Sequence, residues 1–492
     1  IDAHQADWKV NVFGQCKSWL NSGLQPRAMT RDLDWGVKVP VKDTDGKVMY
    51  VWFDAPIGYI SFTKELRPND WQNYWQSDDA EIIHFIGKDN IVFHCIIFPA
   101  VLMCTDKYKW ATNVPANEFL NLESDKISTS RNHAVWLHEY LLDFPGKTDE
   151  LRYVLTSIAP ETKDADFTWK DYQLKVNSEL VSILGNFVNR VMVLSHKFYG
   201  GKTPGAKRID PTANLVYSNS FEKLSREIDR AIAGMKAHLA NFRFRDAQSE
   251  MMNIARAGNL FLTETEPWKV QKTNEELAKN IMHDCVNVAV NIAFACAPFL
   301  PQTHKSILKQ LNVSGCEKDL GYFWTGDGGF MHYFGIETQQ HTLNPAELLF
   351  KNIEDEEITR QLEKLQKTKM ENEAASKTTA PAKAEVTFDD FSRMDIRIGQ
   401  ILEAEKVKGA DKLLQLKVDT GLDQRTVISG IAEHYKPEDI VGKKVSILVN
   451  LAPRKIKGIE SHGMILLAED KNGKLTFVLP EDNGKENGSV VR

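Results

Sequence analysis

AEIIHFIGKDNIVFHCIIFPAVLMC, residues 80–104, is the stretch on which the predicted architecture rests. Residues 80–87 form an apolar run of strand length, Gly87-Lys88-Asp89 is a turn, and the nearly all-apolar residues 90–104 predict a helix. A second strand candidate, VMYVWFD over 48–54, is followed by a helix candidate that starts near Pro56. Alternating strands, turns and helices predict an α/β layer with a parallel sheet over residues 1–125.

Beyond this region the hydrophobic pattern becomes helical. One apolar stripe, ended by Gly200-Gly201, is formed by Leu180, Ile183, Leu184, Phe187, Val191 and Leu194. Similar helices over 220–240, 243–264 and 274–297 complete an α-helical bundle within residues 171–350. Residues 351–385 predict a short charged helix and a flexible linker. Residues 386–492 contain short Val-, Ile- and Leu-rich runs separated by turn residues, which predict an all-β barrel.

Composition limits the classes of protein that fit. The chain has 492 residues, 42% hydrophobic residues and a net charge of −6, so any nucleic-acid contact must use local basic patches. The six cysteines, at 16, 95, 104, 285, 296 and 316, have no C-x-x-C spacing, which favours a reducing cytoplasmic location over a disulfide or zinc framework. The longest apolar stretch, 286–301, is interrupted by Asn287 and Asn291 and predicts a buried helix, with no membrane association.

A polar stretch, NLESDKISTSR over 121–131, follows an apolar run at a place where a strand should end and a helix begin. It brings together Lys126 and the hydroxyls of Ser128, Thr129 and Ser130. A polar loop with a helix N-cap explains this composition. A mobile loop that binds phosphate explains it as well. The stretch alone leaves both interpretations open.

Two further groups of residues have the same ambiguity. A strand, the turn Gly87-Lys88-Asp89 and a helix together form a geometry that binds anions, although any surface turn can have these residues. Asn90 and His94 share a helix face, where a lone histidine is usually a satisfied core group. Trp52, Pro56 and Tyr59 cluster at the end of a strand and suit a polarizable apolar ligand such as a thioether, or simple packing.

Taken together, six stretches resemble the methionyl-tRNA synthetase family of class I aminoacyl-tRNA synthetases in order and spacing. They are TRDLDWGVKVP (30–40), YVWFDAPIGYI (50–60), FIGKDNIVFH (85–94), NEFLNLESDKISTSR (117–131), GNFVNR (185–190) and EPWKV (266–270). The resemblance implies part of a Rossmann-like α/β catalytic domain (1–125) and a signature-loop and stem-contact region (126–170). An α-helical anticodon-binding bundle (171–350), a charged helix with a linker (351–385) and an all-β OB-fold tRNA-binding barrel (386–492) follow.

The resemblance also implies roles for individual residues. The implied methionine-binding residues are Trp52, Ala55, Pro56, Tyr59 and His94. The implied ATP-binding residues are Gly87, Lys88, Asp89 and Lys126, and the implied catalytic residues are Arg31, Lys126, Ser128 and Ser130. In the family the signature loop reads KMSKS and closes on the triphosphate. This chain has Thr129 in place of the second lysine, so Lys126, the serines and Arg131 have to compensate.

The implied reaction is the activation of methionine by ATP to methionyl-adenylate, followed by transfer to tRNA(Met). The expected substrates and cofactors are methionine, tRNA(Met), ATP and substrate-associated Mg²⁺. Neither step needs a protein nucleophile, since positioning and electrostatic stabilisation do the work. The family's H-I-G-H motif is absent from these residues. We therefore expect an incomplete catalytic domain that does not form methionyl-adenylate alone, without a metal site, and with zinc only if a missing N-terminal part carries it.

The tRNA contacts implied by the resemblance lie in the bundle and the barrel. They are Asn186, Arg190, Pro267, Trp268, Lys412, Arg454, Lys455, Ser461 and Met464. Residues 386–492 have 17 basic and 17 acidic side chains, but 443–459 has five basic residues and no acid. This local charge predicts salt-dependent backbone binding, although a solvated lysine-rich face explains it too. Barrels of this type commonly pair, so we expect a homodimer.

Two other functions fit parts of the sequence. A non-catalytic tRNA-binding module would keep the bundle and the barrel, but it would have no use for the Trp52, His94 and Gly87–Asp89 cluster. An assembly scaffold would use the charged helix and the tail. Stabilisation by methionine separates the enzyme from the module, and salt-dependent tRNA binding separates both from the scaffold.

Overall fold

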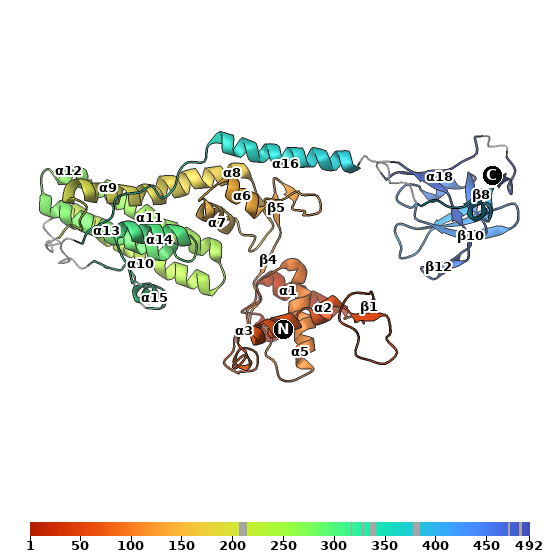
Figure 1. Ribbon diagram of the computed structural model, residues 1–492, viewed down its shortest axis with the longest axis horizontal. Helices are drawn as coiled ribbons and strands as arrows, with labels where there is room; N and C mark the ends of the chain where they lie inside the picture. Colours follow the sequence, from red (N-terminus) through yellow and green to blue (C-terminus); the bar gives the residue numbers. More distant parts are fainter. Residues whose placement is uncertain are drawn as a thin grey trace. The chain divides into compact units, whose positions relative to one another are not determined.

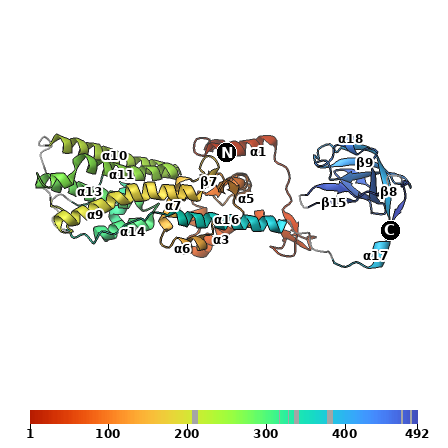
Figure 2. The same cartoon turned by 90° about the horizontal axis from the view of Figure 1, so that it is seen from above.

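The computed structural model forms two compact units, Ile1–Thr368 and Lys369–Arg492. Figure 1 shows the chain with its elements labelled, and Figure 2 shows it from above. The residues that the structure describes are 1–205, 214–315, 317–326, 329–334, 341–376, 384–470, 473–481 and 485–492.

The N-terminal region of the first unit combines short strands with helices. Its elements up to the first parallel strand are η1 (Asp2–His4), α1 (Val10–Ser22), β1 (Thr30–Asp32), β2 (Lys47–Met49), α2 (Val51–Asp54), α3 (Ile57–Leu66) and α4 (Gln72–Trp75). β1 and β2 are antiparallel. The predicted strand over 48–54 is wrong after Met49, because Tyr50 bonds to Met29 and the chain turns into α2. The predicted helix start at Pro56 is confirmed, since Pro56 is the N-cap of α3.

The predicted parallel sheet is present as one pair of strands. β3 (Ile86–Gly87) pairs in parallel with β4 (Ala116–Asn117), and a bridge joins Ile83 to Asn113. The helix predicted over 90–104 is confirmed in three segments, η2 (Lys88–Asn90), η3 (Phe93–Ile97) and α5 (Phe98–Met103). Its buried face packs on α1 through Ile91, Cys95, Val12 and Cys16, so the strand–turn–helix unit has a core.

A small three-stranded sheet follows. β5 (Leu120–Leu122) pairs antiparallel with β6 (Asp125–Lys126) and parallel with β7 (Ala165–Phe167). Three helices accompany this sheet in the chain: α6 (Leu137–Asp143) and α7 (Thr148–Ser157) lie between β6 and β7, and α8 (Trp169–Lys175) follows β7. Trp169, Tyr140 and Phe144 are fully buried and stacked, and they join this region to the core of the helical bundle.

The bundle is helical as predicted. Its elements are η4 (Val176–Gly185), α9 (Asn186–Tyr199), α10 (Leu215–Ala240), α11 (Phe244–Thr265), α12 (Pro267–Val270), α13 (Glu275–Cys296), α14 (Pro301–Leu311) and α15 (Glu317–Thr325). In both views α10 and α11 run side by side, and α13 packs on α11 and α14. Gly200 ends α9 with a left-handed φ of 60°. In the described part of the chain no helix is long and apolar enough to cross a membrane.

The apolar stretch 286–301 confirms the predicted buried helix, because α13 is buried along most of its length. The two asparagines that interrupt it bind backbone groups. Asn287 exchanges hydrogen bonds with Phe334, and Asn291 does so with Met331. Burial of these amides is tolerated because their donors and acceptors are satisfied.

The charged helix is longer than predicted. α16 (Asp355–Ser376) begins within the first unit, where Gln361 Nε2 and Lys364 Nζ donate to Asp143 at 2.9 and 2.5 Å. Residues 377–383 of the predicted linker lie outside the described residues.

The second unit confirms the all-β barrel. Its elements are α17 (Phe388–Ser392), β8 (Ile396–Lys406), β9 (Leu414–Asp419), β10 (Gln424–Ser429), α18 (Pro437–Ile440), β11 (Lys444–Leu448), β12 (Arg454–Ile456), β13 (Ile459–Ser461), β14 (Met464–Ile465), β15 (Leu467–Glu469), β16 (Leu475–Phe477) and β17 (Val490–Val491). The strand order is β10-β9-β8-β11-β14, and β17 pairs with β8. Hydrogen bonds from Ile428 N to Ser461 Oγ and from His462 N to Thr426 O bring β10 next to the β13–β14 segment, at the other end of the strand order.

Candidate active site

A hydrogen-bonded pair between α3 and η3 joins two residues predicted to bind methionine. Tyr59 Oη lies 3.1 Å from His94 Nε2, and His94 Nδ1 lies 3.1 Å from the carbonyl oxygen of Asn90. A carbonyl only accepts hydrogen bonds, so a neutral His94 has its proton on Nδ1 and its Nε2 accepts from the Tyr59 hydroxyl. Burial lowers the pKa of His94, against the opposing effect of the Asn90 carbonyl, so the imidazole is neutral near pH 7.

The aromatic residues next to this pair form a continuous cluster. The ring centroids of Trp52 and Phe93 are 5.0 Å apart, and those of Phe93 and His94 are 5.3 Å apart. Phe93 and His94 lie in the π-helical turn η3, a widened helix turn of the kind often found at functional sites. The structure therefore joins Trp52 to His94 through Phe93, a residue that no sequence pattern indicated, and joins Tyr59 to His94 directly.

A second histidine in this cluster was also missed. The His84 ring lies 5.1 Å from the His94 ring and 5.4 Å from the Tyr59 ring. Burial, and then the neighbouring His94, lower the pKa of His84 to about 4, so it is neutral near pH 7. Its place in the predicted strand 80–87, just before the anion-type turn, was the signal that could have found it. The cluster is thus aromatic, polarizable and uncharged.

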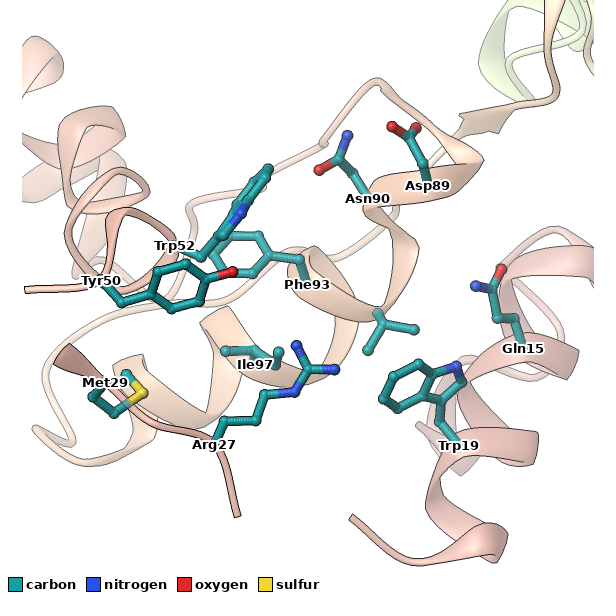
Figure 3. A pocket seen from close by; sticks show the side chains of 11 residues that line it. Gln15, Trp19, Arg27, Met29, Tyr50, Trp52, Asp89, Asn90, Phe93 and Ile97 are labelled. Atoms are coloured by element: carbon teal, nitrogen blue, oxygen red, sulfur yellow. The ribbon is translucent and has the colours of Figure 1, made fainter. Parts of the chain in front are cut away.

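Beside the cluster lies a cavity of about 310 Å³. Four aromatic side chains line it, as Figure 3 shows: Trp19, Tyr50, Trp52 and Phe93. Its polar lining residues are Gln15, Arg27, Asp89 and Asn90. Cavities with mostly aromatic walls and a few polar groups are the usual form of small-molecule sites.

Only some of the residues predicted to bind methionine and ATP line this cavity. Trp52 and Asp89 line it, whereas Tyr59 and His94 lie in the adjacent cluster. Pro56 is buried at the start of α3, and Ala55 is exposed between α2 and α3. The cluster and the cavity meet at Trp52 and Phe93, so a ligand in the cavity would contact the wall that the cluster supports.

Lys88, predicted to bind ATP, has two acidic partners. Its Nζ lies 2.7 Å from both Glu118 and Asp164. These hydrogen bonds, first that with Asp164, raise the pKa of Lys88. Gly87 precedes it in extended conformation, and an added Cβ there would lie 2.7 Å from an Asp89 carboxylate oxygen. The turn therefore holds a cation whose charge is already balanced by carboxylates.

The signature stretch forms a short hairpin. Ser128 and His133 exchange two backbone hydrogen bonds of 2.9 Å, and Asn132 N donates to Thr129 O at 3.0 Å. The hydroxyls of Ser128 and Ser130 lie 3.2 Å apart. The predicted strand end is confirmed at Lys126, but the helix α6 begins only at Leu137 because the hairpin lies between them.

Lys126 and Lys88 approach the same aromatic ring. Their ammonium nitrogens lie 5.9 and 4.3 Å from the centroid of Phe119. Lys126 is exposed, and Arg131 at the hairpin tip is exposed too. The hairpin and the Gly87–Asp89 turn thus each place a lysine near the Phe119 ring.

Arg31, predicted to act in adenylate formation, lies on β1. Its guanidinium carbon lies 3.7 Å from the centroid of Tyr50, a ring that lines the cavity. Its Nη1 donates to the carbonyl oxygens of Ala28 at 3.1 Å and Thr30 at 2.8 Å. Arg31 therefore supports the cavity wall from outside.

The predicted anticodon residues converge on one end of the bundle. The Arg190 guanidinium carbon lies 5.0 Å from the Trp268 ring centroid, a cation–π geometry. Asn186, one turn earlier on α9, donates to Asn259 at 3.4 Å, and Pro267 is buried at the start of α12. Residues 78 positions apart in the sequence thus form one half-exposed stacking surface.

The predicted tRNA residues of the barrel differ in accessibility. Arg454 and Lys455 are exposed on the β12–β13 hairpin, Met464 is 48% exposed, and exposed Lys412 pairs with Glu433 at 3.2 Å. Ser461 is buried, and its Oγ accepts from Ile428 N at 3.0 Å. The hydroxyl of Ser461 therefore already has a structural bond.

The basic stretch 443–459 is divided by the fold. Lys443 and Lys444 stand at the start of β11, and Lys444 Nζ donates to Asn487 at 2.5 Å. The other three cations follow the far end of this strand, about 13 Å away at the usual rise per residue. The five cations thus lie on two elements, with Lys443 and Lys444 at the start of β11 and Arg454, Lys455 and Lys457 on the β12–β13 hairpin.

Comparisons with known proteins agree with this geometry. A family model for class I tRNA synthetases (M) matches residues 1–192, one for the anticodon binding domain of methionyl tRNA ligase matches 212–370, and one for a tRNA binding domain matches 396–489. The methionine–tRNA ligase of Christiangramia forsetii is 51% identical over 494 residues, covering 100% of this chain and 70% of that protein. The chain belongs to the methionine–tRNA ligase family. The Bacteroides fragilis ligase is 52% identical over 491 residues, covering 100% of the chain and 69% of that protein.

The shared fold extends to solved structures of methionine–tRNA ligases. The Mycobacterium tuberculosis methionyl-tRNA synthetase in complex with methionyl-adenylate matches with a TM-score of 0.60 at 21% identity, over 71% of this chain and 65% of that one. The family, the class I ligase function and the three-part fold predicted from the sequence are therefore confirmed. The chain spans about 70% of the length of its relatives from Christiangramia forsetii and Bacteroides fragilis.

Methionine–tRNA ligases use ATP and Mg²⁺, which enter as substrate and substrate-bound ion. Within the ranges that the structure describes, no group of three or more His, Cys, Asp or Glu side chains could hold a metal ion.

Proposed function

We propose that residues 1–170 supply the methionine side and the signature hairpin of the ligase active site. The observation that carries this proposal is the Tyr59–His94–Asn90 chain of hydrogen bonds beside the Trp52 and Phe93 rings. A neutral, aromatic and polarizable wall suits a thioether, which is apolar and has a weak acceptor sulfur. The non-catalytic alternative gives no reason to keep an uncharged, internally bonded cluster next to a cavity.

In the proposed reaction, this chain positions methionine and stabilises the charge that develops on the departing pyrophosphate. The aromatic wall holds the methionine side chain while a carboxylate oxygen of methionine attacks the α-phosphorus of ATP. The α–β phosphoanhydride bond then breaks, and pyrophosphate leaves with the electron pair. Lys126 and the hydroxyls of Ser128 and Ser130 donate to the departing oxygens. Lys88 contributes less, because Glu118 and Asp164 already balance its charge.

The bundle and the barrel bind tRNA(Met) in this proposal. Anticodon bases stack on Trp268 and are contacted at their edges by Arg190 and Asn186, the usual way of reading single-stranded RNA. The barrel adds salt-dependent contacts to the tRNA backbone through Lys412, Arg454 and Lys455, with Met464 beside them. We also propose that the barrel pairs the chain into a homodimer and that the enzyme acts in the cytoplasm.

The test is methionine binding by the 492-residue chain, measured by calorimetry. We expect Tyr59→Phe to weaken binding by about tenfold, because it removes the hydrogen bond that orients His94. Tyr74→Phe is the matched control, since Tyr74 is a similarly exposed tyrosine on α4, outside the cluster. Equal effects of the two variants, or no binding by the unmodified chain, would overturn the proposal.

Methionine binding is separate from turnover. The prediction that the isolated chain does not form methionyl-adenylate stays a prediction, and methionine-dependent ATP–pyrophosphate exchange by the chain would refute it. A chain that binds methionine without exchanging pyrophosphate would agree with both statements.

A further inference from the structure

Arg27 is a cation in the cavity wall for which the proposed function gives no role. It follows α1 in the loop before β1, and it lines the cavity together with Trp19, Tyr50 and Trp52. Figure 3 shows its guanidinium pointing between Ile97 and Trp19, with Asp89 and Asn90 at the opposite end of the lining. Arg27 is therefore placed to contact whatever occupies this space.

The bonding of Arg27 differs from that of Arg31 and Arg67, two other arginines that lie over aromatic rings in the N-terminal region. Its guanidinium carbon lies 5.5 Å from the Trp19 ring centroid. Arg67 stacks at the same distance on Tyr74, but it is also paired with Asp70. Arg31 uses its Nη1 for two backbone carbonyls. Among the residues that the structure describes, none forms an ion pair or hydrogen bond with Arg27, so its five N–H donors are available.

The charges in the cavity wall indicate which end of a ligand lies near Arg27. Arg27 is the cation of the lining and Asp89 is its acid. The contact with Trp19 uses the face of the cation and none of its N–H donors, which leaves these donors for two-point binding of a carboxylate or phosphate. The rings of Tyr50, Trp52 and Phe93 offer apolar contact for the remainder of the ligand.

We propose that Arg27 is the anion-binding residue of this cavity and receives the carboxylate of methionine or the phosphate of the nucleotide. This proposal rests on the proposed function, since it takes the ligand to be one of the ligase substrates. It adds a residue that neither the signature stretches nor the family motifs above contain. Arg27 orients the ligand by holding its anionic end, while Asp89 at the other end repels that group.

The test uses two pairs of ligands that differ only in the anionic group, methionine with methioninol and adenosine monophosphate with adenosine. Affinities are measured by ligand-observed NMR titration of the full chain. We expect Arg27→Gln to weaken binding of the anionic member of one pair by about tenfold and to leave its neutral partner unchanged. The pair that responds identifies the carboxylate or the phosphate as the bound group.

Two controls make the result specific. Arg67→Gln removes an arginine with the same stacking geometry outside the cavity, and it should change no affinity. Arg27→Lys keeps the charge and should recover part of the lost affinity. Equal weakening of charged and neutral ligands by Arg27→Gln, or no change in either pair, would overturn this proposal. The proposed function would not be affected by that result if methionine binds and Tyr59→Phe weakens its binding. Absence of methionine and nucleotide binding by the unmodified chain would overturn both proposals.

Discussion

The aromatic cluster around His94 and the signature hairpin differ in burial and in how their polar groups are bonded. In the cluster, His94 is 5% exposed and its two ring nitrogens are both bonded within the protein. In the hairpin, Lys126 and Ser130 are exposed, and the hydroxyls of Ser128 and Ser130 bond to each other. In the proposed function, the methionine side chain meets a preorganised wall, whereas the triphosphate, which has to enter and leave, meets a cation and hydroxyls on a surface loop.

The first prediction tests how strongly the cluster depends on its buried histidine. His94→Ala removes a packed ring and leaves the Tyr59 hydroxyl without its partner, so we expect a local loss of about 2–3 kcal/mol. Ser128→Ala in the hairpin should cost less than about 0.5 kcal/mol. Hydrogen exchange of the 91–103 and 126–133 backbone amides measures both. Comparable losses in the two variants would remove the contrast between a buried and an exposed half.

The second prediction concerns pH. Burial holds the pKa of His84 at about 4, below its ordinary value near 6.5, and it lowers the pKa of His94 as well. Between these values the unfolded chain binds protons that the folded cluster does not. Stability is therefore complete above about pH 6.5 and is lost as the pH falls toward about 4, by about 1–2 kcal/mol once partial exposure is discounted.

His84→Gln should remove most of this loss between pH 6.5 and pH 4.5. His138→Gln, at an exposed histidine of α6, is the control and should leave the pH dependence unchanged. Hydrogen exchange of residues 84–103 at the two pH values reads out the cluster itself. A profile that is the same in His84→Gln and in the unmodified chain would contradict the assigned protonation states.

The third prediction concerns pyrophosphate binding by the signature hairpin. Thr129→Lys restores the second lysine of the family's signature at the tip of the hairpin, and we expect pyrophosphate to bind about fivefold more tightly. The gain should shrink as salt rises, because both partners are exposed. Thr359→Lys, the same change at an exposed position of α16, is the control. Equal gains in both variants would mean that net charge, and not the hairpin, binds the anion.

The local elements could be predicted because their signals are local. The apolar stripe of 180–194, the glycine stop at Gly200 and the β-type runs after residue 386 all gave elements that the structure contains. The strand predicted over 48–54 failed after Met49, since Val51, Trp52 and Phe53 suit a strand as well as a short apolar helix turn, and tertiary contacts decide between them.

The parts of the site that escaped prediction depend on contacts between distant residues. Lys88 meets Asp164, 76 positions later, and no pattern near Lys88 announces that partner. His84 and Phe93 join the cluster through ring contacts with residues from other elements. The five cations of 443–459 are divided between the start of β11 and the β12–β13 hairpin, a division that the charge count alone does not indicate.

The most direct test of the central claim is a nuclear Overhauser measurement with methionine labelled at its S-methyl group and bound to the chain. We predict contacts from this methyl group to the rings of Trp52, Phe93 and Tyr59, with the contacts to Tyr59 and Phe93 reduced in His94→Ala. A methyl group that shows contacts to none of these rings, while methionine binds, would contradict it.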